Sequence, residues 1–136
     1  MTDRPVPVPD RDSAPFWDGV AAGELRLQCC RGCGAWRWPA RAICNRCHSF
    51  EADWVAASGR GTVISWIRTH QPFMRAFQDD IPYATIQVQL DEQDDIQMIG
   101  RLSDPGLEPV IGMRVEAGFT SIGGEPPLVV WRPLAP

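Results

Sequence analysis

The sequence contains no lysine, because all 13 of its basic residues are arginine. Without lysine, the chain can form no Schiff base with a carbonyl substrate and no Walker-type phosphate loop. The G-x-S-x-G, G-x-G-x-x-G and H-E-x-x-H motifs of hydrolases, dinucleotide-binding enzymes and zinc proteases are also missing. His48 and His70 are the two histidines. These absences leave no recognisable catalytic constellation, so we do not expect this chain to be an enzyme on its own.

Long apolar runs are absent too, and the N-terminal residues lack the apolar segment of an export signal. We therefore expect a cytoplasmic protein with no membrane partner, in a compartment where thiols stay reduced. The formal net charge is −4, and a metal ion held by four thiolates would add about −2. This balance argues against a duplex nucleic-acid binder, which should be basic.

Cysteine is concentrated in one stretch, because all five cysteines lie between Cys29 and Cys47. Four of them follow the pattern C-x2-C-x10-C-x2-C: Cys30, Cys33, Cys44 and Cys47. Two thiolates three positions apart on a tight turn can face one point, and two such turns supply a tetrahedral set of four sulfurs. Cys29 has no partner at this spacing and is expected to be a bystander.

Disulfides, a redox dithiol and ordinary buried cysteines are the other interpretations of these pairs, and each fits less well. Disulfides need an oxidising compartment, and a redox C-x-x-C usually stands alone beside a βαβ pattern, which is absent. The spacing therefore predicts a structural metal site, with zinc as the default and iron in a rubredoxin-like site as the alternative. A closed shell of four sulfurs leaves no open position for water or substrate, so this metal would build structure and not catalyse.

The chain divides into four predicted segments. These are a flexible proline-rich tail at 1–12, a short helix and lead-in strand at 13–28, a zinc ribbon at 29–53 and an OB-fold at 54–136. Ser13 is the expected helix N-cap and Gly23 the expected stop. Barrel strands are predicted at 62–70, 83–90, 96–102, 112–119 and 128–131.

A mainly β fold follows from this segment order, with a five-stranded barrel whose first strand is long and strongly curved. Gly100 is a candidate β-bulge, and residues 91–95 are expected to be an acidic turn without a catalytic role. Phe16 and Trp17 lie on one face of the predicted helix. Their side chains either pack on the rest of the fold or contact a partner chain, since exposed aromatic residues anchor interfaces.

Several short stretches, taken in order, resemble a family of acyl-CoA-associated proteins long filed as domain of unknown function thirty-five. Its members combine an N-terminal helix, a rubredoxin-like zinc ribbon and a C-terminal OB-fold. The matching stretches are Pro15-Phe16-Trp17, Gly23-Glu24-Leu25 through Gln28, the two cysteine pairs with Gly34, Pro39-Ala40-Arg41, residues 58–63, Pro82-Tyr83, residues 90–92 and residues 111–113. The departures are the extra Cys29 and His48, where the family usually has glycine.

The resemblance implies a non-catalytic subunit that docks on an acyl-CoA enzyme and helps to hold the CoA thioester. Such enzymes are thiolase-like (lipid-transfer-type aldolases of steroid side-chain breakdown, or acyl-CoA synthases) or hot-dog-fold enoyl-CoA hydratases. It also implies a metal-binding role for the four cysteines. CoA phosphates suit arginine forks, so the candidate contacts are Arg37, Arg41, Arg68 and Arg75, although for each one taken singly an ordinary surface arginine is the favoured interpretation.

Two other functions are compatible with these domains. OB-folds and zinc ribbons both occur in single-stranded nucleic-acid binders, which need exposed aromatic residues beside a basic groove. Trp66 and Arg68 fit that requirement, but the acidic second half of the chain does not. A rubredoxin-like electron carrier would use the same four thiolates to hold iron.

Overall fold

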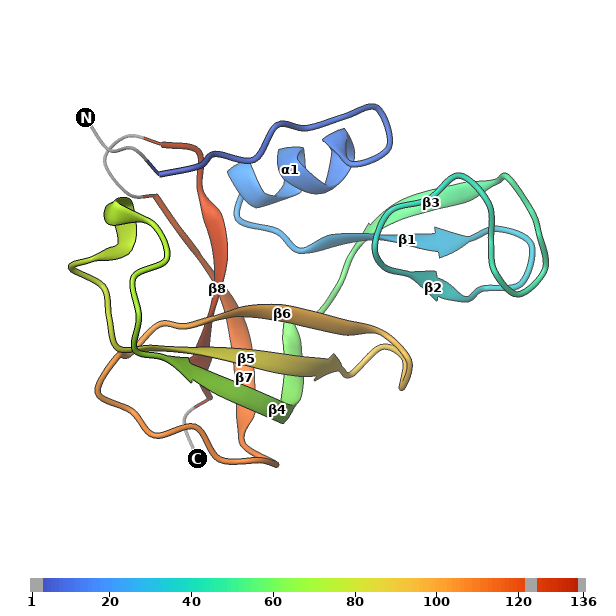
Figure 1. Ribbon diagram of the computed structural model, residues 1–136. Helices are drawn as coiled ribbons and strands as arrows, with labels where there is room; N and C mark the ends of the chain where they lie inside the picture. The colour runs from blue at the N-terminus through green and yellow to red at the C-terminus, as the bar shows by residue number, and fades with distance from the viewer. Residues whose placement is uncertain (1–3, 122–124, 135–136) are drawn as a thin grey trace.

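A small three-stranded sheet and a closed five-stranded barrel form the β structure of the computed structural model, which describes residues 4–121 and 125–134 (Figure 1). The helix and the sheet strands are α1 (Ala14–Ala21), β1 (Arg26–Cys30), β2 (Trp36–Arg37) and β3 (Ala52–Ala56). The barrel strands are β4 (Arg60–Thr69), β5 (Tyr83–Leu90), β6 (Gln97–Leu102), β7 (Arg114–Thr120) and β8 (Leu128–Pro133). This arrangement confirms the predicted mainly β fold with one short helix.

Helix α1 packs against β1 and β3 through the side chains of Phe16 and Val20, which are buried. It starts after Ser13, but the Ser13 side chain makes no hydrogen bond into the helix. The Ser13 hydroxyl instead accepts from the Asp10 backbone N–H at 3.1 Å. At the other end Gly23 has φ 79°, a left-handed conformation in which glycine carries no steric penalty. The helix therefore lies where the sequence predicts it.

The barrel has the strand order β4-β5-β6-β8-β7, and β7 pairs with β4 to close it. Neighbours are antiparallel except β6 and β8, which run parallel. This is the Greek-key order of an OB-fold. The first strand, β4, has a register shift between Val63 and Ser65. A bulge at that point bends the strand, which explains how it can be long and still close the barrel.

The prediction of a β-bulge at Gly100 is wrong, because β5 and β6 keep a continuous register through the pair Ile86–Gly100. Gly100 serves packing instead. A Cβ atom at this position would lie 2.7 Å from the Trp131 ring, closer than atoms can approach without displacement. The Trp131 side chain is fully buried, so the glycine leaves room for the largest side chain of the core.

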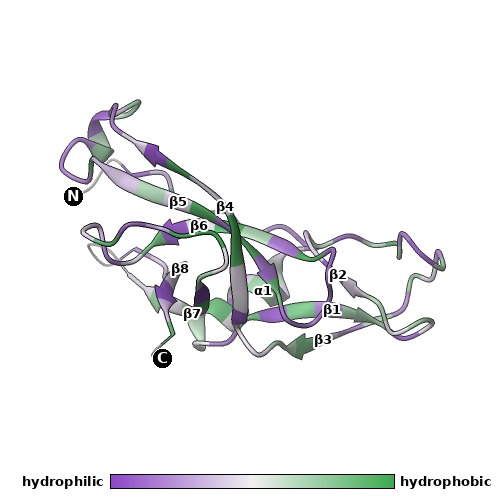
Figure 2. Cartoon of the chain, turned by 90° about the horizontal axis from the view of Figure 1, so that it is seen from below, coloured by the Kyte–Doolittle hydropathy of each residue, from purple (hydrophilic) through white to green (hydrophobic). Residues whose placement is uncertain are grey.

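The core lies inside the barrel and continues under α1. Strand β5 alternates strictly between buried and half-buried residues, as its sequence predicts for a strand with one face in the core. Hydrophobic residues, green in Figure 2, occur along β4 and β1, which belong to the two different sheets. One buried cluster joins Phe16, Val20 and Leu27 to the barrel residues, so the ribbon and the barrel share a core where they meet.

The predicted domain boundaries remain predictions, and two observations bear on them. Strand β3 pairs with β1 along its whole length, so it crosses the expected limit at residue 53. In the expected tail, Arg4 forms an ion pair with Asp80 at 2.6 Å and its guanidinium lies 4.9 Å from the Phe77 ring. Arg4 of the expected tail thus contacts the connection between β4 and β5.

Candidate metal centre

The four predicted cysteines meet at one end of the three-stranded sheet. Their sulfur atoms all lie within 4.8 Å of one another. The Sγ atoms of Cys30 and Cys47 are 3.5 Å apart, and those of Cys33 and Cys44 are 3.7 Å apart. A tetrahedral ion with metal–sulfur bonds of about 2.3 Å requires sulfur–sulfur edges of about 3.8 Å. Two of the edges are close to this length and all four sulfurs lie near enough to one another to surround a four-coordinate zinc or iron ion.

The two knuckles that carry these cysteines have the same backbone hydrogen bonds. In the first, Gly34 N–H donates to Cys30 O at 2.9 Å and Cys30 N–H donates to Ala35 O at 2.8 Å. In the second, His48 N–H donates to Cys44 O at 3.0 Å and Cys44 N–H donates to Ser49 O at 2.9 Å. Each knuckle presents its pair of sulfurs in the same way, which explains the C-x2-C spacing.

His48 takes the place in the second knuckle that Gly34 takes in the first. Gly34 has φ 77° and His48 has φ 65°, and His48 is the one non-glycine residue with positive φ among the described residues. The second knuckle therefore keeps its shape without glycine. A left-handed conformation costs a residue with a side chain about 1 kcal/mol or more, so the turn is formed against local strain.

Backbone N–H groups favour thiolates at the first cysteine of each knuckle. The pKa of Cys44 is lowered to about 6 by the backbone N–H groups of Cys47 and Arg46. The pKa of Cys30 is lowered for the same reason, first by Cys33 and then by Gly32. Hydrogen bonds to sulfur stabilise the charged form, and the thiolate is the form that binds metal. The peptide turns thus prepare these sulfurs for an ion.

Cys29 stands apart from this group. It lies in β1 opposite Trp36, and its thiol donates to Gly34 O at 3.5 Å. Burial raises the pKa of Cys29, which keeps this thiol protonated and weakens it as a ligand. The cysteine without a partner in the sequence pattern is therefore also separate in the structure.

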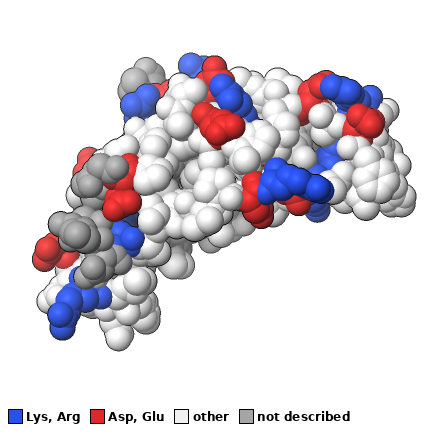
Figure 3. Space-filling view, turned by 90° about the horizontal axis from the view of Figure 1, so that it is seen from above, with Lys and Arg blue, Asp and Glu red and all other residues white. Residues whose placement is uncertain are grey.

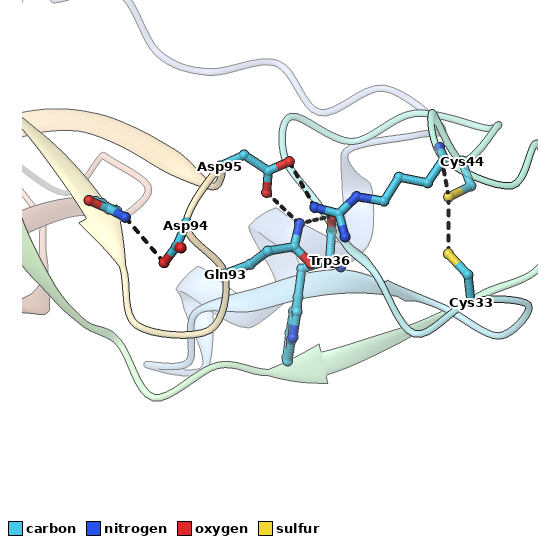
Figure 4. Close-up of polar contacts among 8 residues, drawn as sticks. Cys33, Trp36, Cys44, Gln93, Asp94 and Asp95 are labelled. Carbon is cyan, nitrogen blue, oxygen red and sulfur yellow. Dashed lines mark hydrogen bonds and ion pairs between the residues drawn. The ribbon is translucent and has the colours of Figure 1, made fainter.

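The turn at residues 91–95 joins the barrel to the ribbon (Figure 4). The Gln93 side-chain amide accepts from Trp36 N–H at 2.9 Å and donates to Trp36 O at 3.2 Å. It therefore satisfies both backbone polar groups of one residue in the edge strand β2. Asp95 accepts from Gln93 at 2.6 Å and from the Arg46 guanidinium at 3.0 Å. Arg46 lies between Cys44 and Cys47, so the barrel reaches the second knuckle directly.

Three of the four arginines predicted to contact CoA are constrained or covered to different degrees. Arg37 is 1% exposed; its Nη1 donates to Arg41 O at 2.9 Å, and its Nε and Nη2 have no partner among the described residues. Arg68 pairs with Glu108 at 3.1 Å and its side chain is 19% exposed. The Arg41 backbone is held on both polar groups by the Gln28 side chain. Arg41 is nevertheless an exposed residue.

Arg75, the fourth candidate, is exposed in the short 3-10 turn Arg75–Phe77 between β4 and β5. Arg41 and Arg75 make no ion pair with the described residues. Most other arginines do, and in Figure 3 blue and red groups lie beside each other. A phosphate contact at any of the four remains a prediction, and Arg41 and Arg75 are the two with an accessible guanidinium.

Phe16 and Trp17 of α1 differ in how much of each side chain is left for contact with a partner chain. The Phe16 ring is buried, with its centroid 4.6 Å from that of Trp38 and 5.0 Å from that of Trp17. Trp17 is half-buried and packs on the core from outside. Packing thus accounts for Phe16, and Trp17 keeps a surface that a partner could contact.

Gln93 and Asp95 are residues that the sequence did not single out. Their contacts with Trp36 and Arg46 join positions 57 and 49 residues apart in the chain, and no local pattern signals such a pairing. Within the described residues, the four cysteines form the one group of potential metal ligands, and no helix is long and apolar enough to span a bilayer.

Family models match two parts of the chain. Residues 17–52 match the ChsH2 rubredoxin-like zinc ribbon domain, and residues 54–120 match the ChsH2 C-terminal OB-fold domain. Among solved structures, a chain of the "Ltp2-ChsH2(DUF35) aldolase" is similar, with a TM-score of 0.81 and 33% identity. The similarity covers 93% of this chain and 98% of that one.

Curated relatives carry two kinds of name. A probable enoyl-CoA hydratase alpha subunit of Thermomonospora curvata is 34% identical over 98% of this chain and 41% of its own length. A 3-oxo-4,17-pregnadiene-20-carboxyl-CoA hydratase alpha subunit of Mycobacterium tuberculosis is 35% identical over 93% and 39%. A DUF35 domain-containing scaffold protein of Methanocaldococcus jannaschii is 33% identical over 68% and 65%. The chain thus spans about two-fifths of the length of the hydratase subunits it matches.

Proposed function

Because this chain belongs to the ChsH2 (DUF35) family of zinc-ribbon and OB-fold proteins, we propose that it is a non-catalytic subunit of an acyl-CoA enzyme. Its partner in this proposal is a thiolase-like enzyme such as an aldolase, with a hydratase as the other candidate. The chain docks on this enzyme and helps to present the CoA thioester.

The observation that carries the proposal is the extent of one structural similarity. The DUF35 chain of an aldolase assembly matches this chain over 98% of its own length. The similarity therefore extends over nearly all of that chain. The relatives named as hydratase subunits and as a scaffold protein all point to work within a larger assembly.

The geometry of the metal centre supports a structural role. Four sulfurs form a closed set, so a bound ion has no free position at which to activate water or polarise a thioester. We propose zinc as the ion, because zinc prefers tetrahedral thiolate sites and has no redox chemistry of its own. His48 and His70 are both exposed, and neither belongs to the group of potential metal ligands found in the described residues. This arrangement favours a scaffold over a catalyst.

The nucleic-acid alternative is less well supported by the barrel. Single-stranded nucleic acids stack on exposed aromatic side chains beside basic groups. Trp66 packs against the core and Arg68 is paired with Glu108. The electron-carrier alternative depends only on which metal is bound, and colour decides it, because an iron–thiolate site absorbs visible light and a zinc site does not.

Contact with the thioester is the finer part of the proposal. Arg41 and Arg75 are the candidates with exposed side chains, and a guanidinium can bind a CoA phosphate through two parallel hydrogen bonds. The variants Arg41→Ala and Arg75→Ala in the assembled enzyme are expected to raise KM for the acyl-CoA severalfold with kcat unchanged. Arg11→Ala, an exposed arginine of the N-terminal segment, is the matched control and should change neither constant.

Affinity capture of the tagged chain from its native host tests the central proposal. The expected result is co-purification of a thiolase-like enzyme or a hydratase, identified by mass spectrometry. In assays with the acyl-CoA substrate, the chain alone should show no turnover and the assembly should be active. Recovery of nucleic acid alone, or turnover of a thioester by this chain without a partner, would overturn the proposal.

A further inference from the structure

On the outer face of β4, β5 and β6, two central rows of side chains carry no unpaired charge; the exposed Arg60, at the start of β4, lies outside these rows. The strand registers place Ser65, Gln87 and Ile99 in one row across the three strands, and Ile67, Thr85 and Arg101 in the next. Ile67 is 63% exposed and Ile99 is 70% exposed. The surface is slightly hollowed between these two side chains, beside Gln87. Ile67 and Ile99 are therefore exposed to solvent in these two rows, which we call the β4–β5–β6 wall. The other members of the wall are uncharged except for Arg101 at its edge.

The opposite wall of the same barrel has a different surface. On β7 and β8, Arg132 pairs with Glu116 at 3.1 Å. At the seam where β7 pairs with β4, Arg114 makes two parallel hydrogen bonds to the Asp91 carboxylate, at 2.7 and 2.6 Å. This wall resembles the solvated surface of a monomeric protein, with both charge signs interspersed. The contrast shows that the uncharged wall is a local feature and not the general character of the barrel.

Two polar side chains of the β4–β5–β6 wall, Gln87 and Arg101, already have hydrogen-bond partners within the protein. The Gln87 side chain donates to Gln97 Oε1 at 2.6 Å. Arg101, the charged residue at the edge, donates to Asp80 at 2.8 Å and lies 4.0 Å from the Tyr83 ring centroid. Polar groups with internal partners lose little when water is removed, whereas unpaired polar groups are costly to bury. Gln87 and Arg101 can therefore be covered by an apolar surface at a lower cost than unpaired polar side chains.

Exposed aliphatic residues continue beside β4. The segment that precedes β7 runs along this strand, because Gly112 N–H donates to Val63 O at 2.8 Å. It carries Val110, 57% exposed, and Ile111, 67% exposed. A stable protein interface buries about 800 Å² per partner, more than two isoleucine side chains supply. The added valine and isoleucine bring the available apolar surface closer to that size.

We propose that this wall, with Ile67 and Ile99 at its centre, is the docking surface for an uncharged aliphatic patch on the acyl-CoA enzyme. The proposal rests on the proposed function. Charge complementarity selects the occupant: nucleic acid and anionic lipid both require free cations, and Arg101, the one arginine of these two rows, is held by Asp80. An uncharged apolar protein surface matches it, since interface centres are depleted of charged residues and rich in large apolar ones.

Charge substitutions on the wall test the proposal. Ile99→Lys and Ile67→Lys introduce a charge at positions exposed enough to leave the fold intact, which thermal unfolding and metal content would verify. Each should weaken capture of the enzyme identified with the wild-type chain by at least tenfold, because a buried unpaired charge is costly. Phe50→Lys is the matched control: Phe50 is also 70% exposed but lies in the ribbon, and this variant should bind as the wild type does.

The outcomes separate the two proposals. If the wild-type chain captures no acyl-CoA enzyme, the proposed function falls and the docking surface falls with it. If the wild type and both lysine variants capture the enzyme equally, the docking surface is wrong and the proposed function stands. If the variants instead convert a wild-type homodimer to monomer without affecting enzyme capture, a second copy is the occupant and the proposal is overturned. Slower hydrogen exchange of β4–β6 in the wild-type complex would support it independently of any variant.

Discussion

The ribbon and the barrel are stabilised in different ways, although both are small β structures in one chain. The barrel surrounds a continuous apolar core, with Trp131, Val63 and Ile86 fully buried. The far end of the ribbon, around the knuckles, contributes Cys30, Ala35 and Cys44 as its buried apolar residues. These three residues bury too little apolar area for this part of the ribbon to fold without a metal ion. The comparison suggests that metal ligation replaces a hydrophobic core where the chain is too short to build one.

Loss of the metal is expected to have the largest effect and to act on the ribbon alone. The substitution Cys44→Ser removes the sulfur of a completely buried residue. In isolated zinc-finger peptides, structural zinc contributes on the order of 10 kcal/mol to folding. In the Cys44→Ser variant, or after chelation, amide exchange of the two knuckles at residues 30–35 and 44–49 should become fast while β4–β8 stay protected. Hydrogen exchange measured by mass spectrometry would follow both regions.

Cys29→Ser is the matched control for that experiment, because it removes a neighbouring thiol that is not part of the sulfur cluster. It should leave metal content and exchange rates unchanged. Retention of one metal ion and of a protected ribbon in Cys44→Ser would contradict the structural role of the site.

Truncation of Trp131 is expected to destabilise the barrel and leave the metal site of the ribbon intact. Replacement of a fully buried tryptophan by alanine costs about 3–5 kcal/mol, and Trp131 packs against Gly100 in the barrel. Trp131→Ala should lower the barrel's free energy of unfolding by this amount, measured by denaturant titration, while metal stays bound. Phe50→Ala, at an exposed aromatic residue, should have almost no effect. Release of metal together with barrel unfolding would show that the two regions form one cooperative unit.

A smaller effect is expected at the joint between the two regions. Gln93→Ala removes both hydrogen bonds to Trp36, at a cost of about 1–2 kcal/mol. The Trp36 amide should exchange faster, with metal content and barrel stability nearly unchanged. Gln89→Ala, at an amide that donates to Asp94 and not to the ribbon, provides the comparison. A Trp36 amide that exchanges at the wild-type rate would mean that Gln93 does not hold the joint.

The smallest effect is expected at His48, and it has the opposite sign. Glycine relieves the left-handed strain of about 1 kcal/mol, although its greater freedom in the unfolded chain offsets part of that gain. His48→Gly should therefore stabilise the ribbon by a few tenths of a kcal/mol, detected as tighter retention of metal against a competing chelator. Gly34→His places the same strain in the first knuckle and should loosen metal binding. Weaker retention in His48→Gly would indicate that the histidine side chain itself stabilises the turn.

Local patterns in the sequence predict much of this molecule. The cysteine spacing predicts which four sulfurs meet, since each knuckle is a local turn. The alternation of apolar residues predicts β5 at Tyr83–Leu90, because a strand with one face in the core repeats every two residues. The pattern of apolar residues predicts a long first barrel strand at 62–70, and the structure has it at Arg60–Thr69. Each of these features depends on neighbours within about ten positions.

Contacts between distant positions could not be predicted in this way. Gly100 suggests a bulge when β6 is considered alone, and its packing role depends on Trp131 from a different strand. The turn at 91–95 looks like an ordinary acidic loop, yet Gln93 and Asp95 hold the ribbon. Arg37 looks like a surface cation and is instead buried beside the Arg41 backbone. These outcomes are set by how separate elements pack, which no single stretch of sequence encodes.

Native mass spectrometry of the tagged chain purified from its host is the most direct test of the central claim. The account predicts a complex in which each copy of this chain carries one metal ion and is bound to a subunit of an acyl-CoA enzyme. A spectrum in which the freshly isolated chain is free of metal, and bound to no enzyme, would contradict it.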